Sequence, residues 1–298
     1  MDEYWDGVRQ HWLSFEAGAG SPPANRPSDQ IRIKPMLPLS LYRPTLPLVV
    51  TGLRGAGKSV LYDSILGKVG NSYVPGGQSF DVEPHRTFIR TKESKIRVQA
   101  MVLPGQDSDE RSVALVKFFG NRNYPTGVIH ATCWGYSTVW DPADRRSVVD
   151  EITGEGKKVK IEEIQKWNLR EELVDFKDTC DLLAGAWERR SRVWLIIAVT
   201  KCDLFWPDIG KARDYYIPGR PSPSQPGAPP RESDFCDALR GLVEYVGGGN
   251  LKVAVVPVSC YPQEYKFERV SKKAGLDLGT TSVLVNRFRT LVGEFCEA

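Results

Sequence analysis

Residues 46–66 of this chain read LPLVVTGLRGAGKSVLYDSIL. An apolar run over residues 46–51 is typical of a buried strand, and the segment from Ser59 to Leu66 has the pattern of a helix. Between them, residues 52–59 satisfy G-x-x-x-x-G-K-S, the pattern of a loop whose backbone N–H groups surround phosphate oxygens. The order strand, glycine-rich turn, helix therefore predicts a phosphate-binding loop in an α/β protein.

The residue types in this loop fit phosphate chemistry. Gly55 and Gly57 let the backbone curl so that successive N–H groups point inward, and the start of the helix adds partial positive charge. Lys58 is expected to reach the β- and γ-phosphates, and the Ser59 hydroxyl to ligate Mg²⁺. The predicted phosphate-binding residues are Gly52, Arg54, Gly55, Ala56, Gly57, Lys58, Ser59 and Val60.

The rest of the chain continues the alternation of strands and helices. Apolar runs at 128–133, 193–200 and 253–258 predict buried strands, while 87–91 and 96–102 flank a charged turn and predict a hairpin. Helical patterns cover residues 1–20, 169–190, 232–246 and 282–296. This alternation predicts a parallel or mixed central sheet with helices on both faces.

The domain organisation is expected to be simple. Residues 1–45 are predicted to form an N-terminal helix and an extended arm, followed by one domain over 46–298. Two insertions are expected in that domain, at about 136–168 and 207–231. The second contains the proline-rich run IPGRPSPSQPGAPP (217–230), which excludes a regular helix or a central strand there.

The N-terminal segment has one apolar face. Trp5, Val8, Trp12 and Phe15 recur at near-helical spacing. Such a face either docks a partner or packs on the chain's own domain, and we expect the second.

Composition excludes several classes of protein. Lys and Arg total 40 against 37 Asp and Glu, and the resulting charge of +3 is dispersed, so no nucleic-acid partner is expected. The longest apolar run, Val193–Val199, is too short to cross a bilayer, and residues 1–15 do not resemble a signal peptide. The six cysteines form no C-x-x-C pair. These features predict a cytoplasmic protein without a membrane span.

A second motif suggests which base the nucleotide carries. Thr200-Lys201-Cys202-Asp203 follows the most apolar strand. A carboxylate at Asp203 can accept hydrogen bonds from both N1–H and the N2 amine of guanine, whereas adenine has an acceptor at N1 and no amine at C2. Lys201 would lie along the face of the base. Thr200, Lys201 and Asp203 are therefore predicted to bind guanine.

A third strand end follows at Pro257-Val258-Ser259-Cys260. The backbone N–H groups of Ser259 and Cys260 are predicted to meet the guanine O6. An ordinary exit from a strand into a loop is an equal alternative for these two residues.

Together the motifs stand in the order found in GTPases, each at a strand end. The chain resembles Ras-like P-loop GTPases of the translation-factor-related class, and its loop is most similar to that of the Arf and signal-recognition-particle-receptor β-subunit branch. The resemblance implies a three-layer P-loop NTPase fold that binds GTP/GDP with Mg²⁺. It also implies a molecular switch that hydrolyses GTP slowly and acts on a protein partner through its switch loops, insertions or N-terminal arm.

The chain departs from the family at the second phosphate sensor, D-x-x-G. Residues 102–106 read VLPGQ, so Gly105 is present and could donate its N–H to the γ-phosphate. Gln106 matches the glutamine that orients the attacking water. Val102, however, stands where the family has the aspartate that supports Mg²⁺.

The sequence offers several candidate metal ligands. Ser59 is predicted as a ligand, with Asp107 or Asp109 as candidate substitutes for the missing carboxylate. Thr87 is preferred over Ser79 as the switch-I threonine, although a β-branched strand residue is an equal interpretation of Thr87.

The predicted catalytic residues are Gln106, Lys58 and Arg54. Three roles stay open for Arg54: it obstructs catalysis, it stabilises transferring charge as an arginine finger in cis, or it faces solvent. Two alternative functions also stay open. The missing aspartate favours a GTP-binding scaffold without hydrolysis, and a coincidental match at residues 200–203 would leave an ATP-dependent P-loop enzyme.

Overall fold

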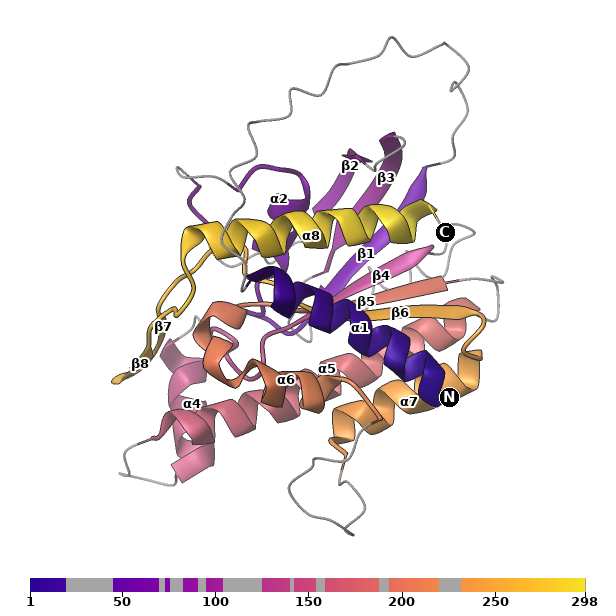
Figure 1. Ribbon diagram of the computed structural model, residues 1–298. Coiled ribbons are helices and arrows are strands. Elements are labelled where there is room, and N and C mark those ends of the chain that lie inside the picture. The colour runs from indigo at the N-terminus through magenta and orange to yellow at the C-terminus, as the bar shows by residue number, and fades with distance from the viewer. Residues whose placement is uncertain are drawn as a thin grey trace.

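A six-stranded sheet forms the centre of the protein (Figure 1). The computed structural model describes residues 1–19, 45–69, 73–75, 83–90, 95–103, 125–139, 142–153, 159–187, 193–219 and 232–297, without most side chains of 83–90. The strands of the central sheet are β1 (Leu46–Gly52), β2 (Glu83–Arg90), β3 (Lys95–Val102), β4 (Gly127–Thr132), β5 (Val193–Val199) and β6 (Leu251–Pro257).

The sheet is mostly parallel. Its strand order is β2-β3-β1-β4-β5-β6, and only the outermost strand, β2, runs antiparallel to its neighbour, β3. Every residue of β4 and β5 is buried, because helices cover both faces of these central strands. The mostly parallel sheet and the antiparallel pairing of β2 with β3 confirm two predictions from the sequence.

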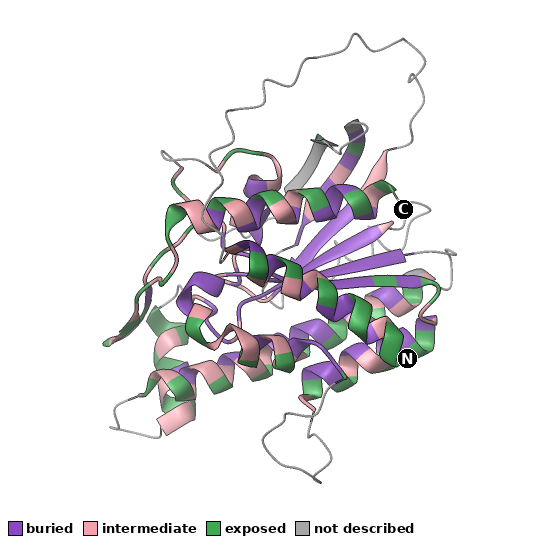
Figure 2. Cartoon of the chain, in the orientation of Figure 1, coloured by how far each residue is buried: buried purple, intermediate pink, exposed green. Residues whose placement is uncertain are grey.

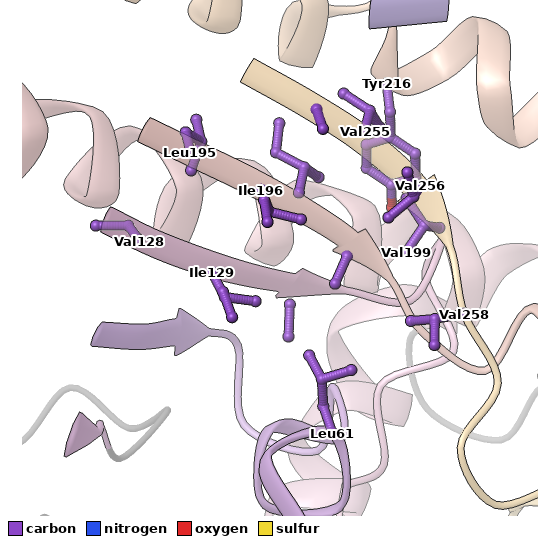
Figure 3. Close-up of a cluster of buried hydrophobic side chains, with 14 of the residues drawn as sticks. Leu61, Val128, Ile129, Leu195, Ile196, Val199, Tyr216, Val255, Val256 and Val258 are labelled. Carbon is purple, nitrogen blue, oxygen red and sulfur yellow. The ribbon is translucent and has the colours of Figure 1, made fainter. Parts of the chain in front are cut away.

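The helices lie in two layers around this sheet (Figure 1). One layer contains α1 (Asp2–Ala19), α2 (Lys58–Ile65) and α8 (Leu278–Glu297), and the other contains α5 (Ile161–Trp187) and α7 (Asp234–Val246). Figure 2 shows the central strands buried and the helices exposed on their outer stripes. In the core, Leu61 of α2 and Tyr216 of α6 (Ile209–Tyr216) approach the strands from separate elements (Figure 3).

The N-terminal helix packs on the rest of the chain. Trp5, Val8, Trp12 and Phe15 are all buried in the common core. At the start of the helix, the Tyr4 hydroxyl donates a 2.7 Å hydrogen bond to the carbonyl oxygen of Leu251 in β6. Helix α1 therefore covers β6, the edge strand of the sheet, and shields it from pairing with another chain. The prediction that this apolar face packs on its own domain is confirmed.

Several elements differ from the expected pattern. Helix α5 begins at Ile161 rather than 169, and α4 (Pro142–Thr153) lies inside the first predicted insertion. Helix α6 lies inside the second. A small hairpin, β7 (Tyr265–Phe267) with β8 (Val270–Lys272), follows β6 and was not expected. Val148 is the one fully buried residue of α4, and Val149 and Ile152 pack partly buried against the core. This apolar contact is short, so the helix leaves only a weak signal in the sequence.

The strand order also marks where a ligand is expected to bind. From β1 the chain proceeds to β2 and β3 on one side of the sheet, and from β4 it proceeds to β5 and β6 on the other. Ligands of open parallel sheets bind beyond the carboxyl ends of the two strands at which the direction changes. Here those strands are the neighbours β1 and β4. No helix in the described parts of the chain is long and apolar enough to cross a membrane.

Candidate functional site

A cavity of about 520 Å³ opens at the carboxyl ends of the parallel strands. Its volume is that of a pocket for a ligand of nucleotide size. It brings together all three motifs of the sequence, although they are far apart along the chain. The predicted residues that line it are Arg54, Gly55, Gly57, Lys58, Ser59, Val60, Thr200, Lys201, Asp203, Ser259 and Cys260.

The glycine loop can be built only from glycine at its tightest points. Gly52, Gly55 and Gly57 have φ angles of +132°, +76° and +91°. A Cβ atom at Gly52 would lie 2.2 Å from the Ala131 carbonyl oxygen, and one at Gly55 would lie 2.2 Å from that of Thr138. The loop therefore runs directly against β4 and the segment that follows it. Gly57 caps α2 without a side-chain hydrogen bond, so backbone N–H groups of the first turn stay available to a ligand.

Lys58 holds its ammonium group over the loop. The side chain is 8% exposed, and Nζ donates to the carbonyl oxygens of Gly52 at 2.7 Å and Leu53 at 3.0 Å. Ser59 and Val60 follow on the same wall of the cavity. A buried cation, glycine backbone and a helix N-terminus consequently meet at one end of the cavity, which suits a polyphosphate.

Residues that follow β5 join the glycine loop to the other end of the cavity. The Thr200 hydroxyl lies 2.5 Å from the Ala56 carbonyl oxygen, with which it forms a hydrogen bond. Lys201 Nζ donates hydrogen bonds to the carbonyl oxygens of Gly55 at 2.7 Å and Tyr136 at 2.9 Å. It also donates to the Thr138 hydroxyl at 2.9 Å. Burial lowers the pKa of Lys201, and nearby acidic groups partly offset this shift. The lysine thus lies between two loops along one wall of the cavity.

Asp203 places a buried carboxylate in the same cavity. The residue is 2% exposed, and Oδ1 accepts a 2.7 Å hydrogen bond from the Ser259 hydroxyl. Oδ2 is also buried and has no hydrogen-bond partner of normal geometry among the described residues. Burial raises the pKa of this carboxyl group, and the hydrogen bond from Ser259 is the largest opposing influence. The hydrogen bond from Ser259 therefore fixes Oδ1 of a carboxylate that belongs to the lining of the cavity.

The end of β6 contributes in an unexpected way. The sequence suggested backbone contacts from Ser259 and Cys260, whereas the Ser259 side chain orients Asp203. The Cys260 thiol points to α2 and donates to the Ser64 hydroxyl at 3.3 Å. Beyond Cys260, the segment leading into β7 lines the cavity through Tyr261, Gln263, Glu264 and Tyr265, which sequence reasoning missed.

Arg54 forms an ion pair with an acidic residue of α4. Its guanidinium forms a 2.9 Å ion pair with Asp144 of α4, and its side chain is 22% exposed. The neighbouring Arg145 lines the cavity and donates to the Val139 carbonyl oxygen at 2.7 Å. Helix α4 is thus held against the glycine loop, a relationship for which the sequence offered no signal.

The residues predicted to support a metal ion are only partly brought together. Val102 ends β3, is 3% exposed and lines the cavity, so an apolar side chain occupies the place of the expected aspartate. Thr87 lies in β2 opposite Val98, four positions before Val102 in β3, or about 13 Å along a strand. The side chain of Thr87 lies outside the described parts of the structure. Its role as a metal ligand stays a prediction.

Other predicted residues lie outside the described parts of the chain. These are Ser79, Gly105, Gln106, Asp107 and Asp109. Among the residues that the structure describes, no three His, Cys, Asp or Glu side chains gather as a metal site. No protein-family model matches this sequence, and no curated protein matches it either.

Proposed function

We propose that this protein binds a guanine nucleotide, GTP or GDP, in the cavity, within a P-loop fold of the Ras-like kind. The observation that carries the proposal is the pairing of Asp203 with the glycine loop in one cavity. The loop suits the phosphates, and the buried carboxylate suits the base.

The base preference follows from the hydrogen-bonding groups. Guanine presents two adjacent donors, N1–H and the N2 amine, and a carboxylate accepts both. Adenine presents an acceptor at N1, which would face the buried Asp203 oxygens without a hydrogen bond. A buried polar site that pairs with one ligand and leaves its own groups unpaired with another discriminates strongly between them.

The phosphate end suits a di- or triphosphate. Lys58 and the first turn of α2 supply positive charge, and the glycines let backbone N–H groups approach the oxygens closely. Mg²⁺ fits this end in part. Ser59 is the described side chain that would hold the ion, and the ion would neutralise phosphate charge.

Slow hydrolysis of GTP to GDP is the leading form of the proposal. In this form the protein is a cytoplasmic switch that acts through a protein partner, with Arg54 and Gln106 as the candidate catalytic residues beside Lys58. Val102 specifically favours a second form, a scaffold that binds GTP and leaves it intact, because the side chain at the end of β3 cannot support the metal.

Direct binding tests the proposal. Fluorescent GDP and GTP analogues are titrated into the purified protein with and without Mg²⁺, and unlabelled ATP is the competitor. We expect saturable binding that GTP competes away and ATP does not. Equal competition by ATP would overturn the guanine assignment. Product analysis after overnight incubation with GTP then separates the switch, which forms GDP, from the scaffold, which does not.

Lysine variants show whether binding occurs in this cavity. Lys58→Ala should abolish nucleotide binding because it removes the buried ammonium group of the phosphate end. Lys68→Ala is the matched control, since Lys68 lies just beyond α2 and pairs in an exposed position with Asp63. Unchanged affinity in Lys58→Ala would place the nucleotide elsewhere.

A further inference from the structure

The loop after β4 makes a tight and unusual turn. Trp134 and Gly135 both have positive φ angles, +48° and +78°. A Cβ atom at Gly135 would lie 2.5 Å from the Gln165 carbonyl oxygen, so the loop runs directly against α5. Such a turn directs successive backbone N–H groups to one side, where they form a concavity that suits an anion.

A buried carboxylate from α5 fills this concavity. Glu172 is 1% exposed, and its Oε1 accepts hydrogen bonds from the N–H groups of Cys133 at 3.2 Å and Gly135 at 3.0 Å. Its Oε2 accepts a 2.6 Å hydrogen bond from the Tyr216 hydroxyl. The same hydroxyl accepts the remaining N–H, that of Trp134, at 2.9 Å. One acid and one tyrosine therefore satisfy three consecutive N–H groups.

The far side of the loop contacts the candidate site. Tyr136 and Thr138 supply two of the three oxygen atoms that accept hydrogen bonds from Lys201 Nζ. The Thr138 N–H donates to the Gly55 carbonyl oxygen at 3.3 Å. The segment 133–138 consequently connects Glu172, which does not line the cavity, to the lysine and the glycine loop that do.

We propose that Glu172 is a positioning residue of the nucleotide site, which fixes the loop 133–138 and through it Lys201 and Gly55. This inference rests on the proposed function. Glu172 acts through the loop. Its carboxylate accepts two backbone N–H groups of the loop directly and orients the Tyr216 hydroxyl, which accepts the third. Burial raises the pKa of Glu172, and the hydrogen bonds from Tyr216 and the loop oppose that shift.

Glutamine at this position would leave the loop incompletely held. Its one oxygen can accept from Cys133 and Gly135, but its amide NH₂ group would face the Tyr216 hydroxyl. The hydroxyl proton would then lose its acceptor in a buried place. Glu172→Gln therefore keeps the size of the side chain and removes the charge and one acceptor.

The test measures how fast nucleotide leaves. A fluorescent GDP analogue is bound to the full chain and chased with excess GDP, at a temperature where circular dichroism shows each variant folded. We expect Glu172→Gln to accelerate dissociation about tenfold, the effect of one weakened charge-assisted hydrogen bond. Glu171→Gln is the control. Glu171 is the preceding residue on α5, is only partly buried, has Glu151 and Arg170 as its charged neighbours, and should leave the rate unchanged.

Tyr216→Phe provides a second variant. It keeps the carboxylate but removes the hydroxyl that bridges Oε2 and the Trp134 N–H, and a smaller acceleration of about threefold is expected. A double variant with Glu172→Gln should dissociate no faster than Glu172→Gln alone, because the two groups act as one unit.

The outcomes separate the two proposals. A wild-type protein that binds no guanine nucleotide overturns the proposed function and this inference with it. Nucleotide dissociation at the wild-type rate from folded Glu172→Gln and Tyr216→Phe overturns the positioning role alone. If Glu172→Gln does not fold, a normal rate in Tyr216→Phe overturns the positioning role.

Discussion

The Ser259 hydroxyl donates a 2.7 Å hydrogen bond to Oδ1 of Asp203, and both residues are buried. They follow neighbouring parallel strands, β5 and β6, so two residues distant in sequence meet at one edge of the sheet. The hydrogen bond fixes the orientation of the carboxylate and leaves Oδ2 as the acceptor without a partner of normal geometry. The end of the cavity that we propose for the base is thus formed by a pair of side chains rather than by a single aspartate.

Removal of the serine hydroxyl should weaken guanine binding. We expect Ser259→Ala to lower the affinity for GDP about tenfold, because Asp203 loses the group that orients it. Titration of a fluorescent GDP analogue measures the effect. Ser282→Ala is the control, since the Ser282 hydroxyl contacts a backbone carbonyl on the exposed side of α8. Equal affinities in the two variants would contradict the proposed role of Ser259.

The raised pKa of Asp203 predicts opposite pH effects on stability and on binding. The folded protein holds this proton more tightly than the unfolded chain, whose carboxyl has a pKa of 3.8. The free energy of unfolding therefore falls as pH rises from 3.8 through the raised pKa. Guanine binding rises over the same interval, because only the carboxylate accepts both donors of the base.

The Asp203→Asn variant tests whether the Asp203 carboxylate causes the pH dependence of guanine binding. Its GDP affinity should be low and nearly independent of pH in the acidic range, whereas that of the wild type should fall as pH is lowered. Asparagine also presents an amide donor to the base, which suits xanthine, a base with a carbonyl oxygen in place of the N2 amine. A wild-type affinity that stays flat down to pH 4 would argue against the carboxylate contact.

A substitution at Gly52 tests how closely the glycine loop packs against β4. Gly52→Ala places a Cβ 2.2 Å from the Ala131 carbonyl oxygen at a φ of +132°, so backbone must move. We expect it to destabilise the protein by about 3 kcal/mol and to abolish nucleotide binding. Gly241→Ala on the exposed face of α7, where nothing lies within 4 Å, should instead stabilise the fold by about 1 kcal/mol. Urea unfolding of both variants measures the contrast.

Much of this architecture follows from short sequence signals. The run from Leu46 to Leu66 predicted β1, the glycine loop and α2, because an apolar strand, glycines and a helix pattern are all local features. The apolar runs of β4, β5 and β6 are equally local. The carboxyl ends of these parallel strands lie at one edge of the sheet and bring the motifs together. Lys58, Lys201 and Asp203 could therefore be assigned to one site from the sequence.

Other features of the candidate site depend on contacts between segments that are distant in the sequence, and these could not be predicted. Nothing near Glu172 in the sequence shows that it accepts hydrogen bonds from Cys133 and Gly135, since α5 and the loop after β4 meet only in the fold. The ion pair of Arg54 with Asp144 is hidden for the same reason. The side-chain role of Ser259 was missed because the motif suggested its backbone alone.

The Arg54–Asp144 pair should affect ligand binding more than stability. The pair is partly exposed, so Asp144→Ala should change the free energy of unfolding by less than about 1 kcal/mol. It also removes a negative charge beside an arginine of the phosphate end, and we expect GTP affinity to rise about threefold. Asp150→Ala, an exposed change farther along α4, is the control. A loss of affinity in Asp144→Ala would indicate that Asp144 itself holds Arg54 in its binding position.

Helix α1 should contribute to stability without contributing to the site. Trp12 is fully buried against β6 and α8, and its indole N–H donates to Glu16 at 2.6 Å. Trp12→Ala should therefore cost about 3–5 kcal/mol in urea unfolding, while exposed Gln10→Ala should cost almost nothing. None of the residues of α1 line the cavity, so GDP affinity should be unchanged wherever Trp12→Ala stays folded. Wild-type stability in Trp12→Ala would show instead that the aromatic face leaves the domain in solution, where it would be free to dock a partner.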